Sequence, residues 1–372
     1  MKNTVENKSL FINGIWTEPI QQATIPVINP STEEVIRKIG YGGKDDAALA
    51  VEAAEKAFRE WSQFSVRERS NMLHHVADLL REKREQIGKV LAEESGKRLH
   101  EGIGEINFAA EYFQWFAEEI RRPHGHIVPS DVRNKSHIYY TEPAGVALTL
   151  TPWNFPISIQ ARKIAPALAA GCTVVARGSQ LAPLSVIELF KCLEEAEFPD
   201  GVVNLIHGPG AQMTEALMSH PAVKVASFTG STEIGKTIVQ QSAKGLIRLA
   251  LELGGDAPFI VFNDADMDKA VEGAMIAKFR NNGQSCIGAN RFYIHDSVYD
   301  EFVTKFRESI SAMKVSDPVN DLSSDLGPVI DLKKQRSFRT VGKGSRGIWS
   351  KAFNIRCKDT FYRLLCSTCN VR

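Results

Sequence analysis

The sequence predicts an α/β protein built around a parallel β-sheet. Strand-like runs alternate with helical runs through the middle of the chain, which is the pattern of repeated βαβ units. The composition agrees, because 43% hydrophobic and 24% charged residues in 372 positions can form a large core and two or more domains. We therefore expect a parallel sheet covered by helices on both faces.

The N-terminal part begins with a predicted hairpin and continues as helices. The segment Phe11-Ile-Asn-Gly-Ile-Trp16 has the pattern of a short hairpin, and from Asp45 apolar residues recur at helical spacing. Ser65-Val-Arg-Glu68 is a capping box, which predicts a helix to about Arg84. Two further helices are expected, over 84–99 and 102–122.

A long hairpin is expected next, from His124 to Glu142. Apolar residues alternate with polar ones on both sides of a polar turn at 130–135, as in paired strands. An aromatic cluster in the helix before the hairpin is expected in the core rather than at a ligand: Phe113, Trp115 and Phe116.

The region after the hairpin carries the βαβ pattern. Its expected strands are 146–150, 173–176, 202–206, 223–228 and 248–253, and the helices between them lie near 158–170, 185–197, 211–220 and 232–243. No G-x-G-x-x-G fingerprint occurs at the first turn, so a typical dinucleotide site is not predicted from that motif.

Two residues are candidates for catalytic roles. Glu252 lies at the end of a strand running into Gly-Gly, and Cys286 lies in the polar, glycine-containing segment Phe279-Arg-Asn-Asn-Gly-Gln-Ser-Cys286. A carboxylate and a thiol are a candidate base and nucleophile. A single intracellular cysteine, however, is more often a small buried hydrophobe.

Two more residues have equally ordinary interpretations when taken alone. Asn154 follows Pro-Trp at the end of a strand, where ligands collect in parallel sheets, but it could be a turn residue. Ser231, where a strand passes into a helix, could be part of an anion site or only an N-cap.

Four motifs occur together in this chain: Thr151-Pro-Trp-Asn-Phe-Pro156, Phe228-Thr-Gly-Ser-Thr-Glu-Ile-Gly-Lys236, Glu252-Leu-Gly-Gly255 and Gly283-Gln-Ser-Cys286. In order and spacing they resemble the NAD(P)-dependent aldehyde dehydrogenase superfamily. The resemblance covers about residues 10–331. It implies a Rossmann-like cofactor domain (1–123 and 143–252), an oligomerisation hairpin (124–142) and an incomplete α/β catalytic domain (253–331).

The resemblance also implies the reaction, oxidation of an aldehyde to a carboxylic acid. Cys286 would attack as a thiolate, and the thiohemiacetal would lose a hydride to the nicotinamide and become a thioester. Glu252 would activate water to hydrolyse it. The side chain of Asn154 and the Cys286 amide would form the oxyanion hole. Four residues are placed at the cofactor: Trp153, Gly230, Ser231 and Gly254.

Two arginines narrow the substrate. The succinate-semialdehyde dehydrogenases carry arginines that bind the distal carboxylate at the positions of Arg162 and Arg280. Either could instead face solvent or pair with a structural acid. The resemblance therefore favours succinate semialdehyde. Gly288 replaces the second cysteine that some of these enzymes use as a redox switch.

The segment Val175-Ala-Arg-Gly-Ser-Gln-Leu-Ala-Pro183 departs from the family. Relatives usually have Lys-Pro-x-Glu there, with Lys and Glu binding the adenosine ribose, whereas this chain has Arg177, Gly178 and Gln180. Loss of the glutamate removes a repulsion toward a 2′-phosphate, and Arg177 adds an attraction. The cofactor is expected to be NADP or NAD. Drift in a gene losing its function is the opposing interpretation.

The end of the chain differs in composition from the rest. The net charge of +1 combines 34 basic and 43 acidic residues before Lys333 with 11 basic residues and one acid, Asp359, from Lys333 onward. Three of the six cysteines also lie there: Cys357, Cys366 and Cys369. A nucleic-acid-binding arm and a partial metal site are possible interpretations. We favour an altered reading frame after about Leu332.

Two function classes therefore remain. The first is an aldehyde dehydrogenase that acts on succinate semialdehyde. The second is a truncated, weakly active or inactive chain that retains a nucleotide-binding module, because the family continues with a Glu-x-Phe-Gly-Pro motif and an oligomerisation strand that this sequence lacks.

The remaining expectations concern location and partners. No apolar run approaches the roughly 18 residues of a spanning helix, and the first nine residues are polar, so a cytoplasmic protein is expected. Cys172 and Cys192 lie in apolar contexts and are expected to be reduced core residues. We expect no metal, nucleic acid or membrane partner, and a homo-oligomer for the full-length family form.

Overall fold

The computed structural model describes residues 5–6, 8–122, 125–331 and 370–371. These residues belong to two compact units. Unit 1 consists of 1–28, 35–94 and 102–253, and unit 2 of 29–34, 95–101 and 254–372. The predictions for the basic tail and its cysteines lie outside the described residues, apart from positions 370 and 371.

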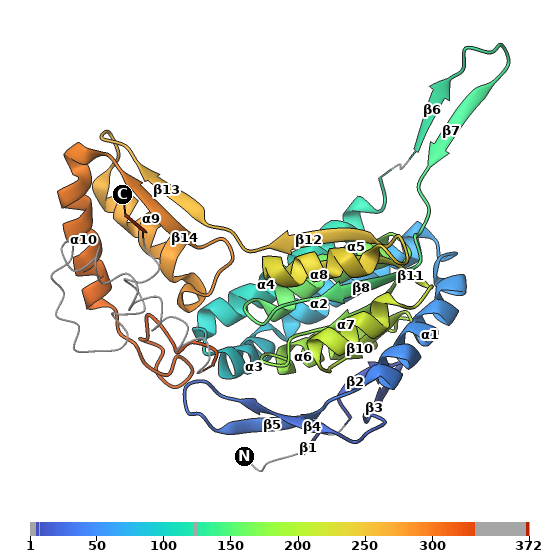
Figure 1. The fold of residues 1–372 in the computed structure, drawn as a ribbon, viewed down its shortest axis with the longest axis horizontal. Coiled ribbons are helices and arrows are strands. Elements are labelled where there is room, and N and C mark those ends of the chain that lie inside the picture. Colours follow the sequence, from blue (N-terminus) through green and yellow to red (C-terminus); the bar gives the residue numbers. More distant parts are fainter. Residues whose placement is uncertain (1–4, 7, 123–124, 332–369, 372) are drawn as a thin grey trace. The chain divides into compact units, whose positions relative to one another are not determined.

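Unit 1 is built on a seven-stranded sheet with the order β12-β11-β8-β9-β10-β2-β3 (Figure 1). The parallel strands are β8 (Val146–Leu150), β9 (Thr173–Arg177), β10 (Val203–Ile206), β11 (Val223–Gly230) and β12 (Arg248–Leu253). The hairpin of β2 (Leu10–Ile12) and β3 (Ile15–Thr17) adds antiparallel strands at one edge. The predicted parallel α/β fold is confirmed.

The parallel strands end at a common edge of this sheet. Leu150 of β8 pairs with Arg177 of β9 on one side and with Phe228 of β11 on the other. From β8 the chain proceeds outward through β9 and β10, and then returns to place β11 on the opposite side of β8. Ligands of open α/β sheets bind at such a reversal of strand order, outside the carboxyl ends of the strands. A site is therefore expected just beyond the carboxyl ends of β8 and β11.

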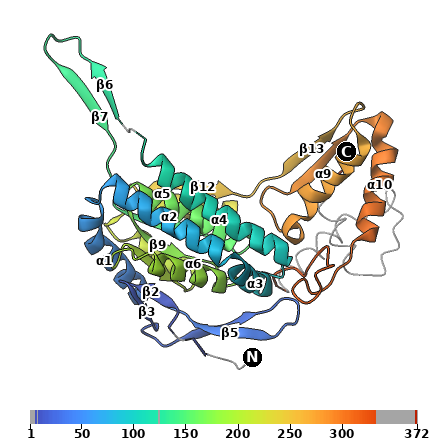
Figure 2. The same cartoon turned by 180° about the vertical axis from the view of Figure 1, so that it is seen from behind.

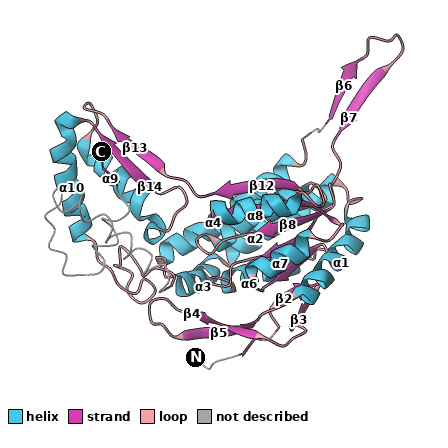
Figure 3. Ribbon diagram, viewed as in Figure 1, coloured by secondary structure: helices cyan, strands magenta, loops and turns pink. Residues whose placement is uncertain are grey.

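Helices cover both faces of the sheet, as the sequence predicts (Figures 2 and 3). On one face lie α5 (Pro156–Ala169) and α6 (Leu184–Glu195), with α2 (Val66–Glu82) packed against both. On the other lie α1 (Lys44–Trp61), α7 (Gly210–Met218) and α8 (Thr232–Ser242). Side chains alternate between the faces, so Val174 and Ala176 join one hydrophobic cluster and Val175 the other.

Helices α3 (Arg84–Ser95) and α4 (Leu99–Glu119) follow α2, whose predicted capping box is present: Ser65 accepts from the Glu68 amide and Glu68 from the Ser65 amide. Phe113 of α4 is buried as expected, but Trp115 is 62% exposed, so its assignment to the core was wrong. Residues two apart on a helix do not share a face.

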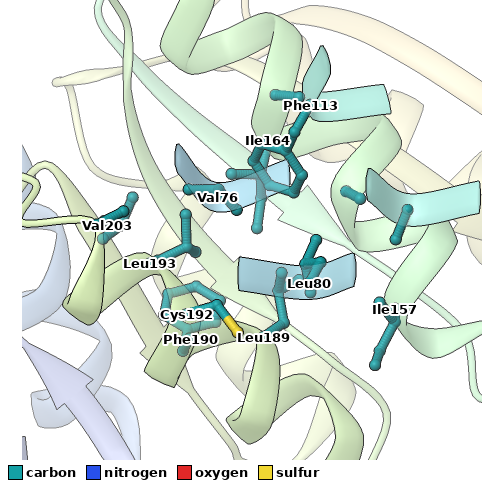
Figure 4. Close-up of a cluster of buried hydrophobic side chains, with 14 of the residues drawn as sticks. Val76, Leu80, Phe113, Ile157, Ile164, Leu189, Phe190, Cys192, Leu193 and Val203 are labelled. Atoms are coloured by element: carbon teal, nitrogen blue, oxygen red, sulfur yellow. The ribbon is translucent and has the colours of Figure 1, made fainter. Parts of the chain in front are cut away.

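The core beneath α2 combines side chains from several helices (Figure 4). Val76 and Leu80 of α2 lie with Ile157 and Ile164 of α5 in this cluster. Cys192 of α6 is a buried free thiol in the same cluster, and Cys172 is also buried and free, which confirms their predicted core role.

Two smaller sheets complete unit 1. Strands β6 (Gly125–Pro129) and β7 (Ser136–Tyr140) form the predicted hairpin, in which Ile127 lies opposite Ile138 and every residue is exposed. A second sheet has the order β1-β5-β4, with β1 at Val5–Glu6, β4 at Thr24–Ile28 and β5 at Val35–Gly40.

Unit 2 contains a parallel three-stranded sheet, β13 (Ala257–Val261), β14 (Ala289–Ile294) and β15 (Asn370–Val371). Two helices, α9 (Met267–Phe279) and α10 (Tyr299–Ala312), contribute to its core. The ring of Phe306 on α10 contacts those of Phe279, Phe302 and Phe292 of β14. Short helical turns lie at η1 (Arg280–Gly283) and η2 (Asp296–Val298). In the described ranges, no helix combines the length and apolarity needed to cross a membrane.

Candidate active site

Four of the predicted site residues lie at the carboxyl edge of the sheet of unit 1. Asn154 is in the loop between β8 and α5, and Ser231 directly follows β11. Glu252 of β12 pairs in register with Thr229 of β11, and Arg177 is the last residue of β9. Because these strands end at one edge, the four residues flank the reversal of strand order between β8 and β11.

The start of α5, next to Asn154, is held by a residue that the sequence analysis did not identify. Phe155 at the N-cap makes no side-chain cap, and Pro156 follows it. Instead, Oε1 of Glu105 on α4 accepts hydrogen bonds from the amides of Ile157 (3.1 Å) and Ser158 (3.2 Å). The sequence carries no local signal for this contact, because Glu105 precedes Ile157 by 52 residues.

Lys163 of α5 is a second unpredicted residue, and it lies near the candidate base. Its Nζ donates to Oγ of Ser227 on β11 at 2.8 Å. Burial lowers the pKa of Lys163 to about 8, and the charge of Glu252 acts in the opposite direction. An amine that changes charge near pH 8 is therefore electrostatically coupled to Glu252.

Arg162, one of the predicted substrate ligands, is exposed on α5 and oriented by Tyr112 of α4. Its Nε donates to the Tyr112 hydroxyl at 2.8 Å, and its guanidinium carbon lies 5.1 Å from the ring centre. The Phe108 ring packs against Tyr112 with centroids 5.0 Å apart. Both terminal nitrogens of Arg162 are left without a partner among the described residues, and they could bind an anion bidentately.

The start of α8 differs from that of α5. Ser231 is exposed and caps the helix itself, since its Oγ accepts from the Ile234 amide at 3.4 Å. A Cβ on Gly230 would lie 2.4 Å from the Phe228 ring, so packing within the protein already requires a glycine there. The positive end of α8 remains open to an anion.

Arg177 and Gln180 lie beyond β9, and both have protein partners. Nη2 of Arg177 donates to the Gly208 carbonyl at 3.0 Å, while its buried Nε has no partner among the described residues. Oε1 of Gln180 accepts from the Tyr41 hydroxyl at 2.7 Å. Burial, with a smaller contribution from Arg177, lowers the pKa of His207 to about 3, so the imidazole beside Arg177 is neutral.

Cys286 lies in unit 2, as an exposed free thiol in a loop of unusual conformation. Asn281, Asn282 and Gly283 have φ values of 53°, 56° and 73° in succession. Left-handed backbone is unfavourable for side chains other than glycine, although asparagine tolerates it best. Such strain persists only where surrounding contacts enforce it.

Those contacts join the loop to other segments of unit 2. The Asn281 amide donates to Oε1 of Glu101 at 3.0 Å, and Oε1 of Gln284 accepts from the Ile330 amide at 3.0 Å. The Asn282 side chain bonds to three further residues: the carbonyls of Gly96 (2.8 Å) and Pro328 (3.0 Å) and the amide of Gly327 (2.9 Å). The Gln of the Gly-Gln-x-Cys motif thus anchors the cysteine loop.

The remaining predicted residues are partly or fully exposed. Trp153 is half-buried in the loop after β8, Gly254 directly follows β12 as the first residue of the third stretch of unit 2, and Arg280 begins η1. The candidate base and amide donor thus belong to unit 1, and the candidate nucleophile and Arg280 to unit 2. No cluster of potential metal ligands occurs among the residues that the structure describes.

Comparison with known proteins supports the resemblance drawn from the motifs. The model of the aldehyde dehydrogenase family matches residues 16–344, a range that extends past Leu332. The chain is 41% identical to a glutarate-semialdehyde dehydrogenase of Pseudomonas putida and to an NADP-dependent succinate-semialdehyde dehydrogenase of Escherichia coli, covering in each case 87% of this chain and 67% of the relative. It is also 41% identical to a 3-sulfolactaldehyde dehydrogenase of Pseudomonas putida (86% and 66%).

Solved structures agree on the fold. An NADP-dependent enzyme of Escherichia coli superimposes with a TM-score of 0.90 at 38% identity, covering 92% of this chain and 71% of that one. The chain spans about two thirds of the length of these relatives. The predicted family and fold class are both confirmed.

Proposed function

The chain belongs to the aldehyde dehydrogenase family, and we propose that it oxidises a short aldehyde with a distal carboxylate, succinate semialdehyde, to the carboxylic acid. The observation that carries the substrate class is Arg162, whose Nε donates to Tyr112 while neither terminal nitrogen has a partner among the described residues. The relatives are named for succinate semialdehyde, glutarate semialdehyde and 3-sulfolactaldehyde, and each of these aldehydes carries an anionic group at its far end. Arg280 supplies a second guanidinium to the same carboxylate.

The side chains of Cys286, Asn154 and Glu252 would carry out the steps before and after the hydride transfer. The Cys286 thiolate adds to the aldehyde carbon, and the Asn154 amide and the Cys286 backbone N–H donate to the oxygen that becomes negative. Loss of a hydride from this adduct to the nicotinamide would leave a thioester on Cys286. Glu252 would then remove a proton from the water that adds to the thioester, and the thiolate would leave.

The residues at the sheet edge fit a dinucleotide. The exposed start of α8 at Ser231 would hold the pyrophosphate, with Gly230, Trp153 and Gly254 beside it. Arg177, with a buried Nε that lacks a partner among the described residues, would face the ribose with Gln180. A 2′-phosphate on that ribose would meet the Arg177 cation and, within the segment 177–183, no carboxylate, so NADP would be accepted as well as NAD. When bound, the cofactor supplies the acceptor for the hydride.

The hairpin of β6 and β7 is proposed to serve assembly into a homo-oligomer. Its strands expose large apolar side chains, with Ile127 at 74% and Ile138 at 71%, directly opposite one another. A monomer rarely keeps such a patch uncovered. The rest of unit 1 would then form the cofactor domain, and the described part of unit 2 would form part of the catalytic domain.

Stopped-flow kinetics with NADP and succinate semialdehyde tests the function. We expect a burst of reduced nicotinamide from the native chain, no turnover from Cys286→Ala, and unchanged NADP binding in that variant. Glu252→Gln should keep the burst but slow the steady state, because it blocks only hydrolysis of the thioester.

Two outcomes would change the proposal. Normal steady-state turnover in Glu252→Gln would remove Glu252 as the base. A native chain that binds NADP but gives no burst would favour the second function class, a chain that retains only nucleotide binding.

A further inference from the structure

The start of α5 depends on a distant residue for its hydrogen bonds. The first amides of a helix have no partner within the helix and need a cap. Phe155, at the N-cap, has no side-chain acceptor, and Pro156 has no N–H to donate. The amides of Ile157 and Ser158 are therefore the first donors that need an acceptor, and Oε1 of Glu105 accepts from both.

Glu105 is itself fixed in place. Glu105 is only 6% exposed. Near the start of α4, a Cβ on Gly102 would lie 2.6 Å from the Gly88 carbonyl oxygen of α3, and a Cβ on Gly88 would lie 2.9 Å from the backbone nitrogen of Ile103. Because the two helices touch through backbone atoms, α4 cannot shift toward α3, and Glu105 is presented to α5 from a rigid support.

We propose that Glu105 is a positioning residue for the oxyanion donor Asn154. Asn154 precedes Ile157 by three residues, so the loop that carries it ends at the amides that Glu105 holds. A misplacement of about 1 Å in a reacting geometry can cost about a hundredfold in rate. The inference rests on the proposed function, in which Asn154 donates to the oxygen of the tetrahedral adduct.

A second buried glutamate provides the internal comparison. Glu94 of α3 is fully buried, and its two oxygens accept from the amides of Leu184 (2.7 Å) and Ser185 (2.9 Å) at the start of α6. Helix α6 follows the loop with Arg177 and Gln180, not the loop with Asn154. Loss of Glu94 should therefore disturb the cofactor, whereas loss of Glu105 should disturb the chemical step.

The variants Glu105→Ala, Glu105→Gln and Glu94→Ala separate these roles in the native chain. With succinate semialdehyde and NADP, Glu105→Ala should slow the burst of reduced nicotinamide by about tenfold or more, approaching the hundredfold to thousandfold cost of removing an oxyanion donor. Its KM for NADP should stay within about twofold. Glu105→Gln should recover most of the rate, because an amide oxygen also accepts hydrogen bonds. Glu94→Ala should mainly raise the KM for NADP.

A cap of an unrelated helix controls for lost stability. Glu68 accepts from the Ser65 amide at the start of α2 and is remote from both loops in the sequence. Glu68→Ala should lower thermal stability while leaving the burst rate and the KM for NADP unchanged. A burst as slow in Glu68→Ala as in Glu105→Ala would mean that destabilisation alone explains the loss.

A double-mutant cycle tests whether Glu105 acts through Asn154. In the Asn154→Ala background, Glu105→Ala should slow the burst by less than about twofold, because the donor that it positions is already gone. Full additivity would overturn the proposal. If Asn154→Ala alone leaves the burst unchanged, the oxyanion assignment in the proposed function fails instead.

Hydrogen exchange measured by mass spectrometry checks the physical basis without turnover. The peptide that contains 153–158 should exchange at least about tenfold faster in Glu105→Ala, and at the native rate in Glu105→Gln and Glu94→Ala. Native protection in Glu105→Ala would contradict the proposal. If this variant does not fold, Glu105→Asp, which withdraws the carboxylate by one methylene, should show the same exchange and kinetic changes.

Discussion

Helices α5 and α8 follow the neighbouring strands β8 and β11, but their N-termini are capped in different ways. At α5, the buried carboxylate of Glu105 accepts from the first amides. At α8, the exposed hydroxyl of Ser231 caps the helix, and no acid from another element reaches its first amides in the described structure.

This difference assigns a role to each helix start. A carboxylate at the N-terminus of a helix offsets its positive potential and repels other anions, whereas a hydroxyl leaves that potential in place. The sealed start of α5 is therefore suited to holding the Asn154 loop still. The open start of α8 is suited to receiving a phosphate. Substitutions near the start of α5 should therefore affect the chemical step and aldehyde binding, whereas substitutions near the start of α8 should affect cofactor binding.

The largest expected effect is on the free energy of unfolding, and it concerns the exclusion of water from Lys163 on α5. Lys163 is buried, and protonating it in the folded state costs free energy, since burial lowers its pKa from 10.5 to about 8. That shift corresponds to about 3 kcal/mol. Below pH 8 the full cost is present, and it disappears as pH rises toward 10.5, where the unfolded chain also loses the proton. Lys163→Met should thus be more stable than the native chain at pH 7.

Urea unfolding between pH 7 and 10.5 measures this effect. The stability advantage of Lys163→Met over the native chain should fall by about 3 kcal/mol across that range. The lost hydrogen bond to Ser227 lowers this advantage by a similar amount at every pH, so it does not change the size of the fall. A difference that does not change with pH would mean that solvent reaches Lys163 and that the α5 side is not sealed.

The next effect separates aldehyde recognition from cofactor recognition. Arg162→Ala and Arg280→Ala should each lower kcat/KM for succinate semialdehyde. The loss should correspond to about 1.5–3 kcal/mol of transition-state stabilisation, which is the scale of a charged hydrogen bond. Activity with butanal, which lacks the carboxylate, should change little, and so should the KM for NADP. Equal losses for both aldehydes would identify the arginines as structural and leave the substrate an unspecified aldehyde.

The elements of this fold were predictable from sequence because their signals are local. The capping box at Ser65, the alternating hairpin and the βαβ pattern each lie within a few residues, and the structure contains them. The supporting contacts were not predictable, because Glu105, Tyr112 and Lys163 meet partners at least 50 residues away. A glutamate in a helix carries no sign of which amide it will meet. The prediction that Trp115 lies in the core was wrong for a related reason, because adjacent aromatic residues on a helix face different directions.

A smaller effect should appear at the ribose loop. Gln180→Glu together with Arg177→Lys restores the residue types usual in relatives, adding a repulsion toward a 2′-phosphate and weakening a forked hydrogen bond. The ratio of kcat/KM for NADP to that for NAD should fall by about tenfold, or about 1.4 kcal/mol. The comparison requires constant ionic strength, because salt screens exposed charges. An unchanged ratio would show that this loop does not contact the 2′ position.

The smallest effect tests the open start of α8 directly. Asp, Asn and Ser cap helices about equally well, so Ser231→Asp and Ser231→Asn should have similar thermal stability. Only Asp adds a negative charge where a pyrophosphate would bind, and a charge at a helix end is worth about 0.3–1 kcal/mol. Ser231→Asp should therefore bind NADP about two- to fivefold more weakly than Ser231→Asn in a fluorescence titration at low salt, and the gap should narrow as salt is added. If the two variants bind NADP equally, the phosphates do not lie at this helix start, and the contrast between α5 and α8 would concern folding alone.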